Sequence, residues 1–298
     1  MNTPLPLISI LMPVYNVKDY LSEAIDSILK QIYTNFELII INDGSTDGSG
    51  SIAEAYKSKD PRIKVFHIEN GGASNARNVA LSYAQGELVA FVDSDDTVKE
   101  DYLECLYEGL SKYNADISFC SYYRYVEEEK MYYFPILEEG YEEKEFSGLE
   151  AYQNYYNPVN GYNISLVVPW GKLIKKELFN HITFPAGKPL EDSYTIYKLY
   201  LLTDKIVYIN KHLYIYRIRP NSLMTQNWTK EKILAQIGHH EERLALLATL
   251  GIPISQGNKE DYIASLRICS SHALEAGYID IYKSIEQKIF LIATCSTK

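Results

Sequence analysis

The chain has 298 residues, enough for one large α/β domain or two smaller ones. Its composition, with 46% hydrophobic and 23% charged residues, is that of an ordinary soluble globular protein. The formal net charge of −10 argues against a nucleic-acid-binding protein, which needs a basic surface to neutralise phosphates. It still allows an anionic ligand that a metal ion or a local arginine bridges to the protein.

Several sequence features bear on location. No apolar stretch approaches the roughly 20 residues that span a bilayer, and residues 1–10 lack the basic start and long apolar core of a secretory signal. Four cysteines have the spacing of neither a zinc site nor a disulfide framework: Cys105, Cys120, Cys269 and Cys295. Because isolated thiols fit a reducing cytosol, we expect a cytoplasmic protein without a transmembrane segment. Residues 281–298 form a modest amphipathic pattern, which leaves peripheral association with the inner face of a membrane open.

Strand and helix patterns alternate through the first hundred residues. Apolar runs predict strands at 7–13, 38–41, 63–69 and 87–96, and helical spacing predicts helices at 17–32, 47–59 and 71–86. Continuous apolar strands joined by helices imply a parallel sheet with both faces covered. In such sheets ligands bind outside the carboxyl ends of the strands, where this chain carries Asn16, Asp43 and a run of acids that starts at Asp93.

The pattern is looser after Asp96. It predicts helices at 99–113, 148–157 and 190–203, strands at 116–128, 130–138, 205–210 and 213–219, and a strand or turn followed by a short helix at 167–179. From about Trp228 onward the spacing is helical, with breaks at 251–253 and at Gly277. We expect a mixed or antiparallel extension of the sheet and then a helical region.

Three carboxylates, Asp93, Asp95 and Asp96, follow the last strand of the first half. On a strand Asp93 and Asp95 point the same way, and two acids at a sheet edge suit Mg²⁺ or Mn²⁺, which take oxygen ligands and share them with substrate phosphates. A dication would also remove the repulsion within the cluster. The alternative is a solvated acidic turn in which Asp95 or Asp96 caps the next helix. The position beside other polar strand ends favours the metal site.

Four segments in this order resemble glycosyltransferase family 2, with the GT-A fold: ISILMPVYN, ELIIINDGSTDGS, GGASNARNVAL and ELVAFVDSDD. The resemblance continues through PWGKLIKKELF, LEDSYTIYKL and LYIYRIRPNSL to about residue 223. It implies an α/β GT-A domain over 1–223: a Rossmann-like nucleotide-binding half over 1–100, with helices on both faces of its sheet, and an acceptor-binding half over 101–223. The remaining residues, 224–298, form the predicted C-terminal helical region and carry no such match.

By that resemblance, side chains at the strand ends and two arginines hold a nucleotide sugar: Pro13, Tyr15, Asn16, Asp43, Arg77, Asp93, Ser94 and Arg217. Asp43 would accept the imide N–H of uracil, whereas the alternative is that it only forms a turn. Gly71 and Gly72 would let the backbone pass close to the ligand. Arg77 would reach the base or the phosphates, unless it is a surface arginine. His212, Arg219 and Ser222 accompany Arg217 in a segment that closes over the diphosphate in this family.

The resemblance also implies a mechanism. Asp95, with Asp93, would bind Mn²⁺ or Mg²⁺, which stabilises the departing nucleoside diphosphate as a Lewis acid. Asp192 would be the base that takes the proton of the acceptor hydroxyl, on the face opposite the diphosphate. Glu191 and Trp170 would contact the acceptor. For Glu191 and Asp192 the alternative is that acids are simply favoured in a first helical turn.

We therefore expect an inverting, metal-dependent glycosyltransferase that moves a hexose or N-acetylhexosamine from a UDP-sugar to a hydroxyl of a lipid-linked or protein-linked glycan. This class of enzyme takes part in surface polysaccharide, cell-wall or glycoprotein glycan assembly. Two alternatives stay open: a sugar-phosphate nucleotidyltransferase, and a catalytically inactive glycosyltransferase-like partner protein. The first generally needs a Gly-rich basic loop after the first strand, where this chain has Pro13 to Asn16 instead. The sequence determines neither the donor sugar nor the acceptor, and it leaves an oligomer open.

Overall fold

The computed structural model describes residues 5–134, 142–153, 155, 163–219 and 228–295. The chain divides into two compact units. The first, Met1–Gly187 with Thr195–Arg219, contains the sheet, and the second, Lys188–Tyr194 with Pro220–Lys298, contains the last three helices. A short segment that precedes the last strand therefore belongs to the helical unit.

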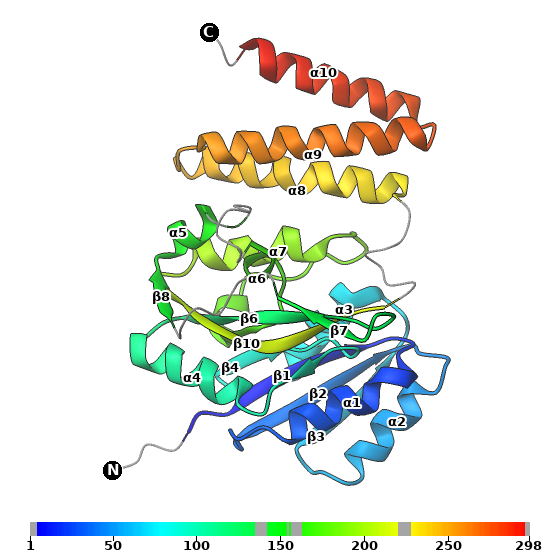
Figure 1. The fold of residues 1–298 in the computed structure, drawn as a ribbon, viewed down its shortest axis with the longest axis vertical. Coiled ribbons are helices and arrows are strands. Elements are labelled where there is room, and N and C mark those ends of the chain that lie inside the picture. The colour runs from blue at the N-terminus through cyan, green and yellow to red at the C-terminus, as the bar shows by residue number, and fades with distance from the viewer. Residues whose placement is uncertain (1–4, 135–141, 154, 156–162, 220–227, 296–298) are drawn as a thin grey trace. The chain divides into compact units, whose positions relative to one another are not determined.

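The first hundred residues fold as alternating strands and helices (Figure 1). The elements are β1 (Ile8–Val14), α1 (Lys18–Leu29), β2 (Phe36–Asp43), α2 (Ser49–Lys57), β3 (Ile63–Ile68), α3 (Gly72–Tyr83) and β4 (Leu88–Phe91). Strand β1 pairs in parallel with β2 and β4, and β2 pairs in parallel with β3. The predicted parallel sheet is confirmed.

Helices cover both faces of these strands. All eight residues of β2 are buried, which explains why the strand is continuously apolar in the sequence. Helix α1 contributes its apolar stripe to a core that includes alternate residues of β1: Leu21, Ala24, Ile25 and Ile28 with Ile8, Ile10, Met12 and Val14. Helix α3 packs against β1 and β2, and Figure 1 shows it on the side of the sheet opposite α1 and α2. All these helices and strands place the carboxyl ends of the strands at one edge.

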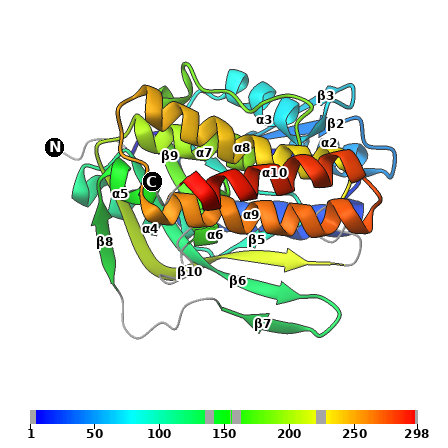
Figure 2. The same cartoon turned by 90° about the horizontal axis from the view of Figure 1, so that it is seen from above.

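The second half of the sheet unit extends the same sheet. Its elements are β5 (Thr97–Val98), α4 (Tyr102–Tyr113), β6 (Ile117–Val126), β7 (Met131–Tyr133), β8 (Glu143–Phe146), α5 (Gly148–Gln153), α6 (Asn163–Val167), β9 (Lys172–Lys175), a 3₁₀ turn (Lys176–Phe179), α7 (Glu191–Leu201) and β10 (Ile206–Ile218). In the described chain the strand order is β3-β2-β1-β4-β9-β6-β10-β5, while β7 pairs with β6 and β8 with β10. The β6–β7 hairpin is seen clearly in Figure 2. The predicted mixed extension is confirmed.

Several element predictions need correction. The strands predicted at 205–210 and 213–219 are one strand, β10, whose pairing with β6 is irregular between Ile209 and Tyr214. Strand β8 and helix α6 were not predicted, because each is too short to show a period. The strand predicted at 130–138 is described only as β7, since residues 135–138 lie outside the described residues, as does the end of the helix predicted at 148–157.

The helical unit contains α8 (Lys230–Thr249), α9 (Gln256–Glu275) and α10 (Ile279–Cys295), which run side by side in Figure 2. Gly251 and Gly277, the predicted breaks, adopt positive φ angles of 69° and 76° in the turns between them. The side chain of Ser255 caps α9 and forms a reciprocal capping box with Asn258. Among the described residues, no helix combines the length and the apolar character that crossing a bilayer requires.

Candidate active site

The loops that follow β1 and β2 are joined by hydrogen bonds. Asn16 has a positive φ of 50°, and its side-chain oxygen accepts from the Thr46 amide at 2.8 Å. Its own amide donates to Ser45 Oγ at 3.1 Å. Tyr15 beside it is 52% exposed, and Pro13 lies within β1. The structure therefore brings the first two predicted strand ends together and leaves a tyrosine ring facing solvent.

Asp43 is buried at the end of β2 and caps a helix. Its two carboxylate oxygens accept from the Gly71 and Gly72 amides, each at 2.8 Å. These are amides at the start of α3, which have no partner inside the helix. The two glycines that we expected to face a ligand thus donate to Asp43. Each carboxylate oxygen can still accept a second hydrogen bond, so a role toward a nucleobase stays a prediction.

Arg77 lies in the second turn of α3 and is only 5% exposed, so the alternative of a surface arginine is wrong. Its Nη2 donates to Asp93 Oδ1 at 3.2 Å, and its guanidinium lies 5.5 Å from the centre of the Phe184 ring. The Asp93 amide donates to the hydroxyl of Tyr214 at 3.1 Å. Ser94, which follows, is buried. The predicted arginine and the predicted ribose or metal ligand are therefore direct neighbours.

Asp95 is held by two arginines that end β10 or follow it. Arg219 Nε donates to Asp95 Oδ2 at 2.8 Å, and Arg217 Nε donates to the Asp95 carbonyl oxygen at 2.9 Å. The side chains of Asp93 and Asp95 are 26% and 23% exposed, so both carboxylates remain within reach of a ligand. Ser222, in the same predicted segment, lies outside the described residues.

Asp96 is buried and accepts hydrogen bonds from β10, and it does not cap a helix. Its Oδ1 accepts from the Arg217 amide at 2.8 Å, and its Oδ2 accepts from the Tyr214 hydroxyl at 2.7 Å. Burial, followed by the charges of Asp95 and Asp93, raises the pKa of Asp96 well above its usual value. The capping alternative is wrong for Asp95 and Asp96, because the next helix is α4, whose N-cap residue is Asp101.

Arg217 is 8% exposed and lies among acids and aromatic rings. Its Nη2 donates to Glu23 Oε2 at 2.6 Å, and its guanidinium carbon lies 5.2 Å from the centre of the Tyr20 ring and 5.3 Å from that of Tyr125. His212, from the same strand, is also buried and stacks on Tyr123 at 4.7 Å. Arg217 already organises the acid cluster, and its contact with a diphosphate stays a prediction.

Trp170 lies inside a stack of aromatic rings and is 4% exposed. Its ring is parallel to that of Tyr214 at 4.4 Å and close to that of Tyr216 at 5.5 Å, while Tyr122 meets it edge-on at 5.1 Å. The hydroxyl of Tyr214 also forms hydrogen bonds with the Asp93 amide and the Asp96 carboxylate. The aromatic stack is therefore connected directly to the acid cluster. These ring contacts do not test the acceptor contact predicted for Trp170, which stays a prediction.

Glu191 and Asp192 are the first two residues of α7, as predicted, and both are partly buried. They belong to the segment Lys188–Tyr194, which is part of the helical unit, whereas the acids at the end of β4 belong to the sheet unit. Leu190, just before the helix, has a positive φ of 60°. Asp192, the predicted base, therefore lies at the start of α7, in a segment that belongs to the same compact unit as the C-terminal helices.

The donor chemistry of the acid cluster fits a hard dication. Among the described residues there is no group of three or more His, Cys, Asp or Glu side chains that could hold a metal ion. Magnesium-type sites, however, commonly use only one or two carboxylates and complete their coordination with substrate phosphates. Asp93 and Asp95 supply such a pair.

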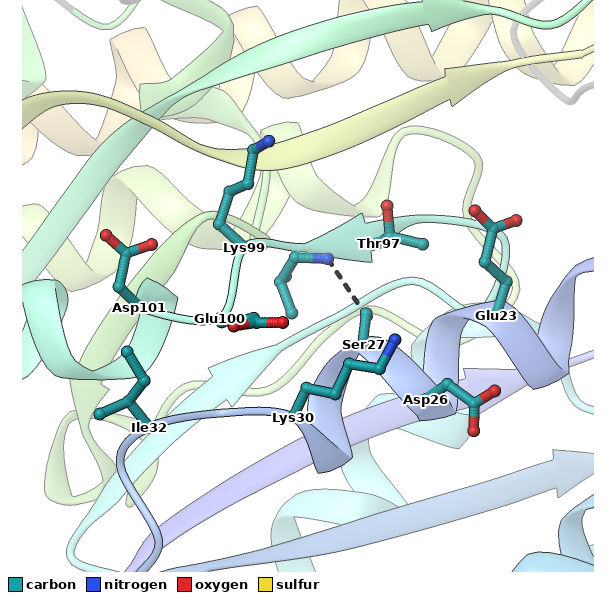
Figure 3. Close-up of a pocket in the computed structure, with 10 residues that line it drawn as sticks. Glu23, Asp26, Ser27, Lys30, Ile32, Thr97, Lys99, Glu100 and Asp101 are labelled. Carbon is teal, nitrogen blue, oxygen red and sulfur yellow. Dashed lines mark hydrogen bonds between the residues drawn. The ribbon is translucent and has the colours of Figure 1, made fainter.

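A cavity of about 840 Å³ lies beside this cluster, between α1 and the β5 segment (Figure 3). It is lined mostly by charged residues, and none of the predicted site residues lines it: Glu23, Asp26, Ser27, Lys30, Ile32, Thr97, Val98, Lys99, Glu100 and Asp101. Ser27 Oγ accepts from the Val98 amide at 3.2 Å, the dashed line in the figure. Two lining residues adjoin the predicted site: Glu23, the partner of Arg217, and Thr97, which follows Asp96 in the chain.

The sequence analysis missed four residues that organise the acid cluster: Tyr20, Glu23, Glu127 and Tyr214. The hydroxyl of Tyr20 donates to Glu127, and both acids pair with Arg217. A usable signal exists for Tyr214 alone, since a tyrosine in the middle of an apolar strand needs a partner for its hydroxyl. The other three lie on α1 and at the end of β6, and their sequence context points to no partner.

A family model described as Glycosyl transferase family 2 matches residues 9–183 of this chain. The chain belongs to glycosyltransferase family 2. The resemblance found in the sequence motifs is confirmed, and the matched span includes β1 to β4, the acid cluster and Trp170.

Similar proteins agree with this family 2 assignment. Glycosyltransferase GlyA of Streptococcus pneumoniae serotype 4 is 40% identical over 283 residues, which are 94% of this chain. The chain spans 40% of the length of GlyA. S. aureus TarS (residues 1–349) in complex with UDP-GlcNAc matches with a TM-score of 0.66 at 21% identity, over 94% of this chain and 90% of that one.

A second structure extends the likeness. Mannosyltransferase PcManGT from Pyrobaculum calidifontis, in complex with GDP-Man and Mn²⁺, matches with a TM-score of 0.60 at 16% identity, over 98% of this chain and 85% of that one. These likenesses establish the predicted GT-A fold of the family 2 chain.

Proposed function

We propose that this family 2 chain is an inverting, metal-dependent glycosyltransferase. It moves a hexose or N-acetylhexosamine from a UDP-sugar to a hydroxyl of a glycan, in the assembly of a surface polysaccharide, a cell wall or a glycoprotein. The observation that carries the proposal is the pair of partly exposed carboxylates, Asp93 and Asp95, at the carboxyl end of β4, each held by an arginine from a different element.

The strand ends and the similar structures support the proposed nucleotide-sugar donor. TarS binds UDP-GlcNAc, and PcManGT binds a GDP-sugar, so the fold accommodates nucleoside diphosphate sugars. In this chain Tyr15 has an exposed ring next to Asn16, after β1. Asp43, at the end of the neighbouring strand β2, has carboxylate lone pairs that can accept hydrogen bonds. We assign these three residues to the base and ribose of a uridine nucleotide, together with Pro13 and Ser94 at the neighbouring strand ends.

Asp93 and Asp95 would hold the Mn²⁺ or Mg²⁺ ion. When bound, the ion supplies positive charge that stabilises the outgoing diphosphate. Arg77, from α3, hydrogen-bonds to the Asp93 carboxylate, and Arg217, from β10, hydrogen-bonds to the Asp95 carbonyl oxygen, so the two arginines keep these residues in place. PcManGT, which contains Mn²⁺, supports the choice of a divalent ion for this fold.

Asp192 is the proposed general base. It accepts the proton of the acceptor hydroxyl while the oxygen attacks the anomeric carbon from the face opposite the diphosphate. Attack from that face inverts the configuration and gives a β-linkage from an α-linked donor. Glu191 and Trp170 are assigned to the acceptor.

Two substitutions test the assignment in the full chain with MnCl₂ and a panel of UDP-sugars. Asp192→Asn should lower kcat by about 10²- to 10⁴-fold, the usual contribution of a general base, and leave the Kd for UDP unchanged. Asp95→Ala should abolish turnover and weaken binding of UDP in isothermal titration calorimetry with Mn²⁺ present. Asp204→Asn, at an exposed acid beyond the other end of α7, is the matched control and should turn over like the unmodified chain.

Wild-type turnover by Asp192→Asn would refute the base assignment. Release of pyrophosphate from UTP and a sugar phosphate would instead favour a nucleotidyltransferase. UDP binding without hydrolysis of any UDP-sugar would favour an inactive partner protein.

A further inference from the structure

The base-bearing turn at the start of α7 is unusual in its backbone. Leu190 has a φ of 60°, in the left-handed region that residues with branched or bulky side chains rarely adopt. The Ser193 amide donates to the Leu190 carbonyl oxygen at 3.1 Å, which closes the turn. Such a conformation persists only when the surroundings hold it in place. The residue that holds it should therefore be found among its buried neighbours.

Tyr194 is a buried residue that follows this turn in the chain. It is 5% exposed, and its hydroxyl donates to the Ala235 carbonyl oxygen of α8 at 3.1 Å. The ring of His239, one turn further along α8, meets the tyrosine edge-on at 5.8 Å. The ammonium of Lys188 lies 4.5 Å from the centre of the Tyr194 ring. All these contacts lie within the helical unit.

Gly238 makes the close approach of Tyr194 possible. A Cβ atom at this position would lie 2.6 Å from the tyrosine hydroxyl oxygen and 3.8 Å from the ring carbon that bears it. Gly238 lies in the middle of α8, a helix of 20 residues, where glycine is less stable than alanine. A glycine at this place is explained by packing, since the tyrosine occupies the space that a methyl group would take.

We propose that α8 fixes the proposed catalytic base through this contact, and that Tyr194 and Gly238 are positioning residues for Asp192. The inference depends on the proposed function for its catalytic part. Asp192 lies two residues before Tyr194, about 200° around the axis of the same helix. Anchoring Tyr194 against α8 thus turns Asp192 to the other side of α7. The C-terminal helices, which the family model does not match, are then part of the catalytic apparatus.

The test uses three variants of the full chain: Gly238→Ala, Tyr194→Phe and the double variant. Gly238→Ala brings a methyl group into the hydroxyl, whereas in the double variant the nearest remaining atom lies at an ordinary van der Waals distance of 3.8 Å. Gly257→Ala in α9 is the matched control, because its Cβ would meet nothing closer than 3.7 Å. Thermal unfolding of each variant establishes that it folds.

Hydrogen–deuterium exchange without any ligand is the first readout. In Gly238→Ala the amides of Lys188–Tyr194 should exchange roughly tenfold faster than in the unmodified chain, while the rest of α8 stays protected. The double variant should return toward the exchange of Tyr194→Phe, and Gly257→Ala should leave this segment unchanged. Equal exchange in Gly238→Ala and the unmodified chain would overturn the proposal, and so would a double variant no better protected than Gly238→Ala.

Turnover is the second readout, with whichever of UDP-Glc, UDP-Gal, UDP-GlcNAc and UDP-GalNAc the unmodified chain hydrolyses in MnCl₂. Gly238→Ala should lower kcat by about 10- to 100-fold with an unchanged Kd for UDP, because a small misplacement of a reacting group is costly. The double variant should regain most of the loss, because it lacks the hydroxyl that the added methyl group meets. If Gly238→Ala loosens the turn but keeps full kcat, the positioning role is refuted. If no UDP-sugar is turned over, the proposed function fails, while the exchange experiment still decides whether α8 holds the turn.

Discussion

Tyr214 connects two residues of the acid cluster to the aromatic stack. Its hydroxyl donates to Asp96 and accepts from the Asp93 amide, and its ring stacks on Trp170. Burial, followed by the nearby charges of Asp96 and Asp93, raises the pKa of Tyr214 well above its usual value, so the hydroxyl stays protonated and remains a donor. One neutral side chain therefore holds two acids of the cluster at fixed positions.

Tyr214→Phe should lower the free energy of unfolding by about 2 kcal/mol, because a buried carboxyl loses a hydrogen-bond donor. Tyr216→Phe is the control: Tyr216 stacks on the same tryptophan, and its hydroxyl has no hydrogen-bond partner among the described residues. It should change stability by less than about 0.5 kcal/mol. Urea unfolding of both variants at 25 °C measures the difference. Equal effects would mean that the hydroxyl of Tyr214 contributes nothing beyond the ring.

At the scale of elements, α8 combines a helix cap with buried polar side chains. Thr229 caps its first turn by accepting from the Lys232 amide. The side chains in question are each at most 2% exposed: His239, His240 and Arg243. Burial, with the charge of Arg243, lowers the pKa of His239 to about 3, and burial with the charges of His239 and Arg243 lowers that of His240 to about 2.

The two histidines should make the helical unit sensitive to acid. In the unfolded chain they take up protons as the pH falls below about 6.5, whereas in the folded chain they stay neutral until about pH 3 and about pH 2. The contribution of the two neutral histidines to the free energy of unfolding is therefore fully present above pH 6.5. It falls as the pH decreases, by up to about 1.4 kcal/mol per pH unit for each histidine. Urea unfolding between pH 7.5 and 5 should show this slope, and the double variant His239→Asn, His240→Asn should have lost it. A slope that survives in the double variant would assign it to other groups.

At the scale of the whole molecule, an acidic chain is proposed to bind an anionic nucleotide. The net charge is −10, and UDP is negative, so the encounter is unfavourable without a bridging cation. The arginines at the site do not remove this repulsion, since Arg77, Arg217 and Arg219 are already paired with protein acids. The proposed dication therefore decides whether UDP binds.

UDP should accordingly raise the thermal stability of the full chain only when Mn²⁺ is present. At a UDP concentration of 100 times Kd the gain should be about 2.7 kcal/mol, from the linkage of binding to folding. Addition of EDTA should cancel it, and Asp95→Ala should show no gain in either condition. An equal gain with EDTA would show that the acid cluster does not bind UDP through a metal.

The sequence predicts much of the sheet and only part of the site. Long apolar runs determine β1 to β4, and the parallel arrangement then brings Asn16, Asp43 and Asp93 to one edge. The hydrogen bond between Asp43 and the start of α3 joins residues 28 positions apart. It depends on how α3 packs against the sheet, and a local sequence pattern does not contain this information. The partners of Tyr214 likewise depend on the irregular pairing of β10 with β6.

The capping of α3 by Asp43 limits how the proposed nucleotide preference can be redesigned. A residue that both supports a helix from a distant strand and is assigned to the base cannot be varied for selectivity alone. Substituting Asp43 removes two hydrogen bonds to main-chain amides, so every library member at this position starts from a less stable fold. Tyr15, which is also assigned to the base and is half exposed, can be substituted at smaller cost to folding.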